Sequence, residues 1–483
     1  MLDTIETNDE ILGIERVLWQ VTTISRKQYS LEMGMDWTLK LLLFKRISEG
    51  KHIEQKWQLI IPEGSRWSNL EEETEGLAEK LNNALSTLEK ANPKLEGIFT
   101  NPETNIWAIL DDGTLSKIFQ LFSVLDLSNQ DSTFEIGLGQ ASERLIEKVV
   151  FSNSRAGVGR NSTPQQISRL MVKLMSPQPG TSVYDPVCVS SEFLIAAARF
   201  MAKTQEDLST LDLYGQSPST QECAIAKINL LLNGVSNADI RQDDCLVEPR
   251  FTQGEELRQF DLVMANPPFG RLSEQLTSYI SDYPPFNQFP YGIPRTSKEF
   301  LFIQHVLSSL KPTGKGIMVL PRGFLFRQGA EGKIRRGIIE AGWIEAIIAL
   351  APKLLYYSGI PVVVVVFNKR KAHRNDILFI DASAEYEQGG SLNVLQLEHI
   401  SKITSTYHKL EEEEGFSKLV SVEEIAKNNF NLSIDQYVYQ VGSSADQSID
   451  IAQEISNLHV LEAQRTDLEE KIDTLLQSLG VKV

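Results

Sequence analysis

The chain has 483 residues, of which 42% are hydrophobic and 23% are charged, and its formal net charge at pH 7 is −17. This length exceeds one typical hydrophobic core and predicts two or three domains. The sequence has no apolar run of membrane-spanning length and no signal-peptide pattern at its start, so we expect a cytoplasmic protein without membrane contact. Three scattered cysteines and six histidines without ligand spacing argue against a disulfide framework and against a metal site.

The acidic balance restricts how this chain can act on nucleic acid. Phosphate binding requires concentrated positive charge, and a chain with a net charge of −17 repels phosphates as a whole. Either a local basic face exists, or a partner supplies most of the contacts to nucleic acid. We interpret the charge as favouring a partner.

The first part of the chain, residues 1–150, is predicted to be a helical domain. Turn signals such as Asn101-Pro102 and Asp111-Asp112-Gly113 separate its shorter helices, and no residue pattern in it indicates chemistry. Two stretches carry apolar residues at helical spacing, namely Ile14, Val17, Leu18, Val21 and Ile24, and then Trp37, Leu41, Leu42, Phe44 and Ile47.

From about residue 151 to about residue 410, strands alternate with helices. Strands are predicted near 183–184, 211–215, 240–244, 260–265, 316–320 and 361–367. Such alternation predicts an α/β domain with a mostly parallel, doubly wound sheet. Ligands bind outside the carboxyl ends of the strands in sheets of this kind, and Asp185, Ser217, Asp244 and Asn266 all fall there.

The predicted strand 260–265 ends in Asn266-Pro267-Pro268-Phe269. Two successive prolines lack N–H groups and fix φ, so the strand cannot continue and the chain is held in a rigid turn. That turn offers the Asn266 amide, the Pro267 carbonyl and the Phe269 ring. Two acceptors beside an aromatic face are complementary to the exocyclic amine of a flipped, planar base. The alternative is a structural turn with a packed phenylalanine.

Residues 271–296 are predicted to form a long loop rich in aromatic residues and proline. Loops of this length beside a site serve as lids or substrate clamps, or are disordered, and the sequence leaves both interpretations open. Four basic residues in and after the loop are candidates for phosphate contacts or for plain surface positions: Arg271, Arg295, Lys298 and Arg322.

The last part, residues 411–483, begins with an acidic run and ends in a predicted amphipathic helix. Its apolar stripe must be buried, either against the helices of a partner or against this chain. The spacing of the stripe, mostly three, four or seven, is typical of a coiled-coil seam: Ile451, Ile455, Leu458, Leu461, Leu468, Ile472, Leu475 and Leu479.

The order of these parts resembles the modification (methyltransferase) subunits of type I restriction-modification systems, which are N6-adenine DNA methyltransferases. The likeness extends from about residue 14 to 479 and includes Asn266-Pro267-Pro268-Phe269 and Leu320-Pro321-Arg322-Gly323. The resemblance implies a Rossmann-like, S-adenosylmethionine-dependent methyltransferase domain at 151–410, between the helical N-terminal domain and a C-terminal segment that docks a partner. It also implies as partners double-stranded DNA, a specificity subunit, a restriction subunit and a second copy of the chain.

The resemblance further implies roles for single residues. Asn266 and the Pro267 carbonyl would hold the adenine N6 amine and leave its lone pair to attack a methyl group, and Pro268 and Phe269 complete this catalytic motif. The positions that correspond to the S-adenosylmethionine site of the family are Thr163, Pro164, Asp185, Ser190, Phe193, Ser217 and Asp244.

The cofactor motif departs from the family at several positions. Val189, Ser191 and Glu192 stand where glycines are expected, and glycine is used there to reach positive φ and to let the backbone approach a ligand. Glu192 would also bring a negative charge towards the methionine carboxylate. Ser217 replaces an acid at its strand end, and an aromatic pair before Thr163 is lost.

Two hypotheses therefore stand side by side. The first is an enzyme, an adenine-N6 DNA methyltransferase subunit whose cofactor pocket has been rebuilt. The second is a catalytically inactive, methyltransferase-like subunit that binds DNA and a specificity subunit as a scaffold. Methylation of RNA or protein by the same motif is a more distant third, because the flanking segments resemble type I subunits.

Overall fold

The computed structural model describes residues 9–24, 26, 29–73, 75–101, 105–154, 162–203, 211–282, 285–356, 359–371 and 375–439. The amphipathic helix predicted over 451–479 lies outside these residues. Among the described helices, none is long and apolar enough to cross a membrane.

The N-terminal part is helical, as predicted. It contains α1 (Asp9–Ile24), α2 (Leu31–Glu49), α3 (Lys51–Trp57), α4 (Leu77–Ala91), α5 (Asp112–Ser123) and α6 (Ser132–Ser154), with short 3-10 turns at Glu63–Ser65, Trp67–Asn69 and Pro93–Leu95. The side chains of Ser30 and Asp111 cap α2 and α5 and satisfy backbone N–H groups of the first turn. The apolar faces close around Trp67, whose ring stacks on Phe119 with 4.3 Å between the ring centroids.

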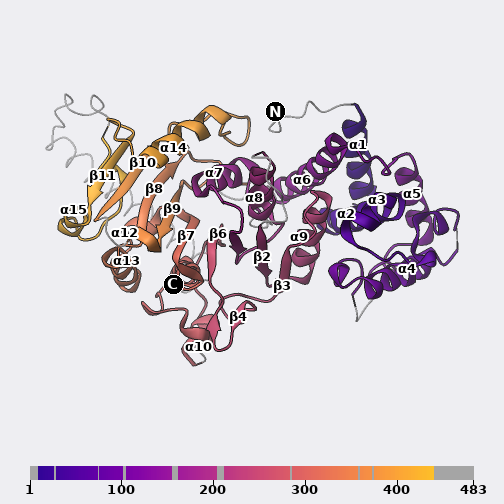
Figure 1. Cartoon of the computed structure of the whole chain (residues 1–483), viewed down its shortest axis with the longest axis horizontal. Helices are drawn as coiled ribbons and strands as arrows, with labels where there is room; N and C mark the ends of the chain where they lie inside the picture. The colour runs from indigo at the N-terminus through magenta and orange to yellow at the C-terminus, as the bar shows by residue number, and fades with distance from the viewer. Residues whose placement is uncertain are drawn as a thin grey trace, which may run out of the picture. The chain divides into compact units, whose positions relative to one another are not determined.

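One helix joins this part to the sheet. Ile225, Ile228 and Leu231 of α9 (Thr220–Leu232) belong to the same hydrophobic core as the N-terminal helices. The helix contacts α2 and α6 on one side and strands of the sheet on the other (Figure 1). The N-terminal helices are therefore packed on the sheet through a shared apolar core.

Nine strands of the described residues form one sheet in the order β11-β10-β8-β9-β7-β6-β1-β2-β3. Their bounds are β1 (Ser182–Asp185), β2 (Asp212–Ser217), β3 (Asp239–Gln242), β6 (Phe260–Ala265), β7 (Leu310–Pro321), β8 (Ile344–Leu350), β9 (Val362–Asn368), β10 (Asp376–Ala382) and β11 (Ser417–Ser421). A separate hairpin consists of β4 (Thr252–Gln253) and β5 (Glu256–Leu257). All neighbouring pairs from β3 to β7 are parallel, as predicted.

Two features of the sheet differ from the prediction. β8 lies in a stretch for which no strand was predicted, and β9 runs antiparallel to both β7 and β8. Every position of β9 is buried, and an unbroken apolar run carries no alternation from which its direction follows. Only residues 351–361 connect β8 to β9, and this connection is shorter than the crossover that a parallel neighbour requires.

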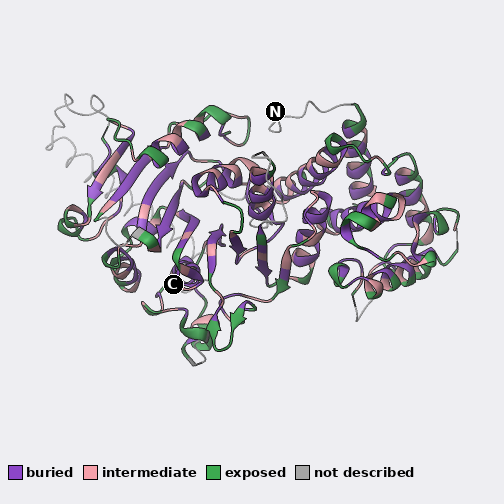
Figure 2. Ribbon diagram, in the orientation of Figure 1, coloured by how far each residue is buried: buried purple, intermediate pink, exposed green. Residues whose placement is uncertain are grey.

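Helices cover both faces of the sheet, and the central strands are therefore buried (Figure 2). One face packs on α7 (Gln165–Met175), α8 (Glu192–Lys203) and α14 (Leu397–Lys409), and the other packs on α11 (Glu299–Ser308) and α13 (Ala330–Glu340). Short elements complete the described chain: α12 (Gly323–Phe326), α15 (Val422–Lys427) and 3-10 turns at Lys369–Lys371 and Ile434–Gln436. This is the predicted α/β architecture.

The prediction of one long loop over 271–296 is wrong, because the segment contains α10 (Glu274–Asp282) and a 3-10 turn at Pro285–Asn287. Ile280 is 1% exposed and packs in the core of the sheet, with Leu276 one turn earlier beside it. Their i, i+4 spacing is a helical signal that the neighbouring aromatic residues and prolines obscure. Gln288 then holds the segment on the sheet by donating to the Leu246 carbonyl at 3.0 Å.

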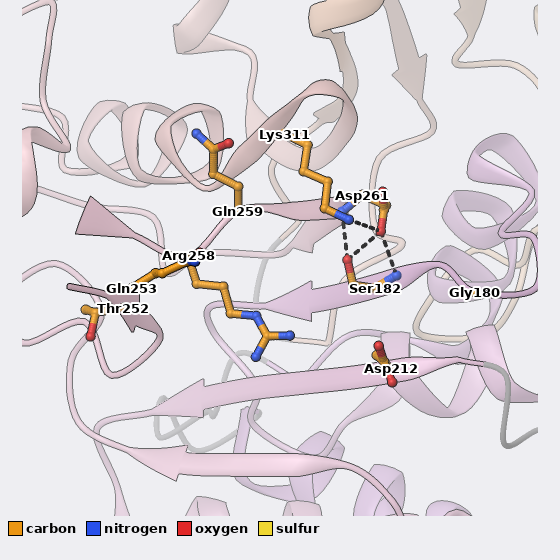
Figure 3. Close-up of a pocket in the computed structure, with 9 residues that line it drawn as sticks. All are labelled: Gly180, Ser182, Asp212, Thr252, Gln253, Arg258, Gln259, Asp261 and Lys311. Carbon is orange, nitrogen blue, oxygen red and sulfur yellow. Dashed lines mark hydrogen bonds and ion pairs between the residues drawn. The ribbon is translucent and has the colours of Figure 1, made fainter. Parts of the chain in front are cut away.

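A pocket of about 480 Å³ opens at the amino ends of the strands (Figure 3). Asp261, which lines it, accepts hydrogen bonds from Lys311 at 2.8 Å and from the Ser182 hydroxyl at 2.6 Å. The Arg258 guanidinium lies over the Tyr214 ring at 4.2 Å. None of the predicted site residues lines this pocket, because they follow the opposite, carboxyl ends of the strands.

Candidate active site

The predicted site residues meet along the carboxyl ends of neighbouring strands. Asp185 and Ser217 are the last residues of β1 and β2, Asp244 follows β3, and Asn266 follows β6 directly. The register of β1 and β2 aligns Asp185 with Gly215, which brings these two strand ends side by side. Parallel pairing thus gathers the four side chains on one edge of the sheet.

Asn266 is 2% exposed, and its Nδ2 donates to Thr163 Oγ1 at 3.1 Å. Thr163 is also buried, in the short segment that leads into α7. In this contact the amide donates and the Thr163 hydroxyl accepts. The structure therefore brings together a residue predicted to be catalytic and one predicted to border the cofactor, which lie 103 positions apart.

The other members of the predicted set take different positions. Pro267 is buried, whereas Pro268 and Phe269 are half-buried, and Phe269 packs at the margin of the core on the α7 and α8 face. Pro164 is the N-cap residue of α7. Phe193 is 2% exposed and lies in the same core, so its side chain has a packing role.

The turn that follows β1 keeps a backbone conformation that favours glycine, although glycine is absent. Ser191 has a φ of +63°, in the left-handed region, while Val189 is not among the left-handed residues. Asp243, at the end of β3, has a φ of +136°. Non-glycine residues in such conformations are costly and gather at functional sites. The replacement of glycines has therefore not removed the turn.

Hydrogen bonds from neighbouring elements hold this turn in place. The Ser191 hydroxyl lies 3.1 Å from Cys188 Sγ, and the Ser190 carbonyl accepts from Asn229 Nδ2 of α9 at 2.8 Å. The backbone N–H of Cys188 donates to the Gln216 carbonyl at 2.9 Å. These contacts fix the turn from the β2 and α9 sides.

We expect Ser191→Gly to stabilise the chain by about 1 kcal/mol, because glycine adopts this φ without the steric cost of a Cβ. Denaturant unfolding measures the difference. Ser219→Gly is the matched control: Ser219 caps α9 at a φ of −100°, where glycine relieves no strain. Lower stability of Ser191→Gly than of the wild type would contradict a strained turn.

The Glu192 side chain, expected to bring a negative charge towards the methionine carboxylate, is paired within the chain. Its carboxylate accepts from the Ser162 hydroxyl, from the Ser190 hydroxyl at 2.6 Å and from the backbone N–H of Thr163 at 3.2 Å. Three donors of the chain itself thus surround one of its oxygens. A negative charge so paired is no obstacle to a ligand on this edge.

Asp185 is a buried acid at the end of β1. It is 1% exposed, and its Oδ1 accepts from the backbone N–H of Val187 at 3.0 Å. Burial raises the pKa of the Asp185 carboxyl well above its usual range, and the nearby Glu192 carboxylate adds to the rise. A buried carboxyl of this kind at a strand end is suited to pair with a cationic ligand group. No group of side chains in the described part of the chain is arranged to bind a metal ion.

A second acid, which the sequence analysis did not select, reaches the end of β2. The Ser217 hydroxyl donates to the carboxylate of Glu222, in the first turn of α9. Ser219 caps that turn by accepting from the Glu222 N–H at 3.3 Å. Asp244, after β3, accepts from the backbone N–H of Leu246 at 2.9 Å. Glu222 thus brings a carboxylate to the end of β2. The signal in the sequence that could have found it is an acid in the first turn of the helix that follows the strand.

A model of the N-6 DNA methylase family matches residues 136–446, and a model of the HsdM N-terminal domain matches residues 14–122. The first match covers more than half of the chain, so the chain belongs to the N-6 DNA methylase family. The MjaVII methylase subunit of a type I restriction enzyme from Methanocaldococcus jannaschii is 31% identical over 424 residues, which cover 84% of this chain and 70% of that protein. The HindI methylase subunit of Haemophilus influenzae is 28% identical over 461 residues, which cover 87% of this chain and 100% of that protein.

A solved structure has the same architecture. It is the methyltransferase subunit of a type I restriction-modification system from Streptococcus thermophilus, with a TM-score of 0.76 and 25% identity over 89% of this chain and 100% of that one. Within its family, the chain is one of the type I methylase subunits, with the fold of S-adenosylmethionine-dependent methyltransferases. The predicted family, fold and enzyme class, a DNA adenine-N6 methyltransferase, are confirmed. The alternative of an inactive scaffold gains no support from these relatives.

Proposed function

We propose that this carboxyl edge transfers a methyl group from S-adenosylmethionine to the N6 amine of an adenine in double-stranded DNA. The observation that carries the proposal is the hydrogen bond between Asn266 Nδ2 and Thr163 Oγ1. It joins the motif that holds the base to the segment beside the β1 turn, so that both halves of the reaction meet at one place.

The base side of the site rests on the Asn-Pro-Pro-Phe turn. With Nδ2 of Asn266 directed to Thr163, Oδ1 is the amide atom that accepts from the adenine amine, and the Pro267 carbonyl accepts the second hydrogen. This arrangement leaves the nitrogen lone pair available for attack and fixes the amine by position and hydrogen bonding alone. The half-buried Phe269 ring offers a stacking face to an adenine that has left its duplex.

The residues at the carboxyl ends of β1 and β2 fit S-adenosylmethionine by their charge and by the conformation of the turn after β1. When bound, the cofactor supplies a methyl group on a positively charged sulfur. Asp185 would pair with the cationic methionine end, while the turn through Ser190 and Ser191 would lie against it. Glu222, held by Ser217, and Asp244 would accept hydrogen bonds from the hydroxyls and base of the adenosine part. Thr163 and Pro164 would border the reacting end.

The partners follow from the charge distribution. Arg271, Arg295 and Arg322 are exposed and lie after β6 and β7, on the edge where the adenine would enter. These three arginines are already counted in the net charge of −17, so the chain as a whole repels phosphates, and we propose that a specificity subunit supplies most of the DNA contacts. Residues 411–483 would dock that subunit, 151–410 would catalyse, and 1–150 would form the helical domain. A restriction subunit and a second copy would complete a cytoplasmic assembly.

Calorimetric titration with S-adenosylmethionine, for the chain alone and with its specificity subunit, tests the proposal. We expect micromolar binding, followed by methyl transfer to adenine in duplex DNA when the subunit is present. Absence of heat at millimolar cofactor in both settings would contradict the proposal and would leave a DNA-complex scaffold. Activity on RNA oligonucleotides without activity on DNA would change the substrate class.

We expect Glu222→Ala to weaken the affinity for S-adenosylmethionine by about tenfold, because a charge-assisted acceptor is lost at the end of β2. Glu248→Ala is the control, since Glu248 is an exposed acid after β3 whose carboxylate pairs with Arg250. Calorimetry on both variants gives the comparison. Equal affinity of the two variants would remove Glu222 from the proposed site.

A further inference from the structure

Glu192 connects two chain segments that carry different halves of the site. The segment 162–164 contributes the Ser162 hydroxyl and the Thr163 N–H, and the turn after β1 contributes the Ser190 hydroxyl. All three donors converge on Oε1 of the one carboxylate. Ser162 and Ser190 also approach each other, with 3.5 Å between their hydroxyl oxygens. A glycine at position 192, as the family has, offers none of these contacts.

The connection continues beyond Glu192 in both directions. On one side, Thr163 Oγ1 accepts from Asn266 Nδ2 at 3.1 Å. On the other side, the Ser190 carbonyl accepts from Asn229 at 2.8 Å, which anchors the turn on α9. Ser162, Thr163, Ser190, Asn229 and Asn266 are each at most 3% exposed, so few water molecules compete for these bonds.

Other acids lie near Glu192, so the groups that donate hydrogen bonds to its carboxylate are needed to stabilise its charge. Asp185, Glu143 and Glu147 are close enough for Glu192 to act on the pKa of each. Arg199, a cation on the same helix, is paired with Glu143. Among these acids, the Glu192 carboxylate is stabilised by its three donors, the hydroxyls of Ser162 and Ser190 and the backbone N–H of Thr163.

We propose that Glu192 is a positioning residue that couples the cofactor turn to the orientation of Asn266. The carboxylate holds Thr163 in place, and Thr163 holds the amide that accepts the adenine amine. Because the same carboxylate holds Ser190, a shift of the turn is passed to Asn266 through three hydrogen bonds, which join Ser190 to Glu192, Glu192 to Thr163 and Thr163 to Asn266. This inference rests on the proposed function. It gives a role to Glu192, which from the sequence alone looks like a loss of the glycine expected in the cofactor motif.

Steady-state kinetics and calorimetry on the full chain with its specificity subunit test this role. For Glu192→Ala we expect kcat for methyl transfer to fall by about 10- to 100-fold, because misplacing a reacting group has effects of this size. The affinity for S-adenosylmethionine should change far less than kcat. Glu192→Gln keeps an acceptor in place and should recover most of the lost rate.

A double variant separates positioning through Thr163 from an independent effect. If Glu192 acts through Thr163, the rate of Glu192→Ala with Thr163→Val should be close to that of the slower single variant. If the fold loss in rate of the double variant equals the product of the losses of the two single variants, the inference is overturned. The matched control is Asp112→Ala, since Asp112 is also a first-turn acid that joins two segments, by accepting from the N–H groups of Gly76 and Leu77 far from the site.

The outcomes distinguish this inference from the function on which it rests. A wild-type complex that neither binds the cofactor nor methylates DNA would overturn both. An active wild type whose rate is unchanged by Glu192→Ala would overturn the coupling alone. An equal loss of kcat in Asp112→Ala would show a general loss of stability in place of positioning and would overturn it as well.

Discussion

Replacing Asn266 by alanine should lower the rate of methyl transfer by about 10²- to 10³-fold, while the affinity for S-adenosylmethionine stays nearly unchanged. In the proposed site the amide would be one of two acceptors that fix the adenine amine, and its loss would leave the Pro267 carbonyl as the other. The Thr163 hydroxyl lies beside the amide and is already hydrogen-bonded to it. The measurement is a single-turnover methylation assay on duplex DNA, with calorimetry on the same preparation.

Asn368→Ala provides the matched control for this variant. Asn368 is also a buried asparagine at the end of a strand, β9, and its Nδ2 donates to Glu345 at 2.9 Å. Its loss should cost stability and leave the methylation rate intact. Comparable rate losses in the two variants would mean that buried amides support the fold in general, and the catalytic assignment of Asn266 would fail.

The second large effect is expected at Asp185. Asp185→Asn should weaken the binding of S-adenosylmethionine by about 10²-fold or more, because a buried cation would lose its charged partner. Asp261→Asn is the control at the other end of the sheet, where the carboxylate pairs with Lys311 and the Ser182 side chain (Figure 3). That variant should lose some stability and keep its affinity. Calorimetric titration of Asp185→Asn and Asp261→Asn with S-adenosylmethionine measures the difference in affinity.

The pH dependence at Asp185 has a definite sign. Burial holds the pKa of the Asp185 carboxyl well above its usual range, so the carboxyl is neutral below that raised pKa and charged above it. Affinity for a cationic cofactor should therefore increase as the pH rises through the raised pKa. The stability of the unliganded chain should change in the opposite sense, since a proton that favours the folded state is lost over the same range. Asp185→Asn should remove both dependences.

Much of the fold can be predicted from local patterns in the sequence. The strands β1, β2 and β6 carry apolar residues and end in a polar residue or directly before one, and parallel pairing then places those ends on one edge. The strand β8 and the direction of β9 could not be predicted from such patterns. There the sequence is apolar without alternation, so nothing in it states that β8 is a strand or that β9 is reversed.

The candidate site divides in a similar manner. The motif at Asn266 is fixed by two prolines, and its place after β6 follows directly. The role of Ser191 depends on its φ of +63°, and the role of Glu192 depends on which donors reach it, and neither is a property of residue type. Glu222 was missed because it lies five residues beyond the strand end that it serves. Replacement of glycine was an incomplete guide, since hydrogen bonds can hold the turn that glycine would otherwise permit.

The three cysteines are distributed along the same edge. Cys188 lies in the β1 turn, Cys223 in the first turns of α9 and Cys245 next to Asp244, and all three are buried. Burial raises the pKa of the Cys223 thiol to about 11 and the pKa values of Cys188 and Cys245 well above their usual range. The thiolate is the form that reacts with peroxides and electrophiles, and both burial and the raised pKa values disfavour it. We therefore expect the sulfurs along this edge to react slowly with oxidants at neutral pH.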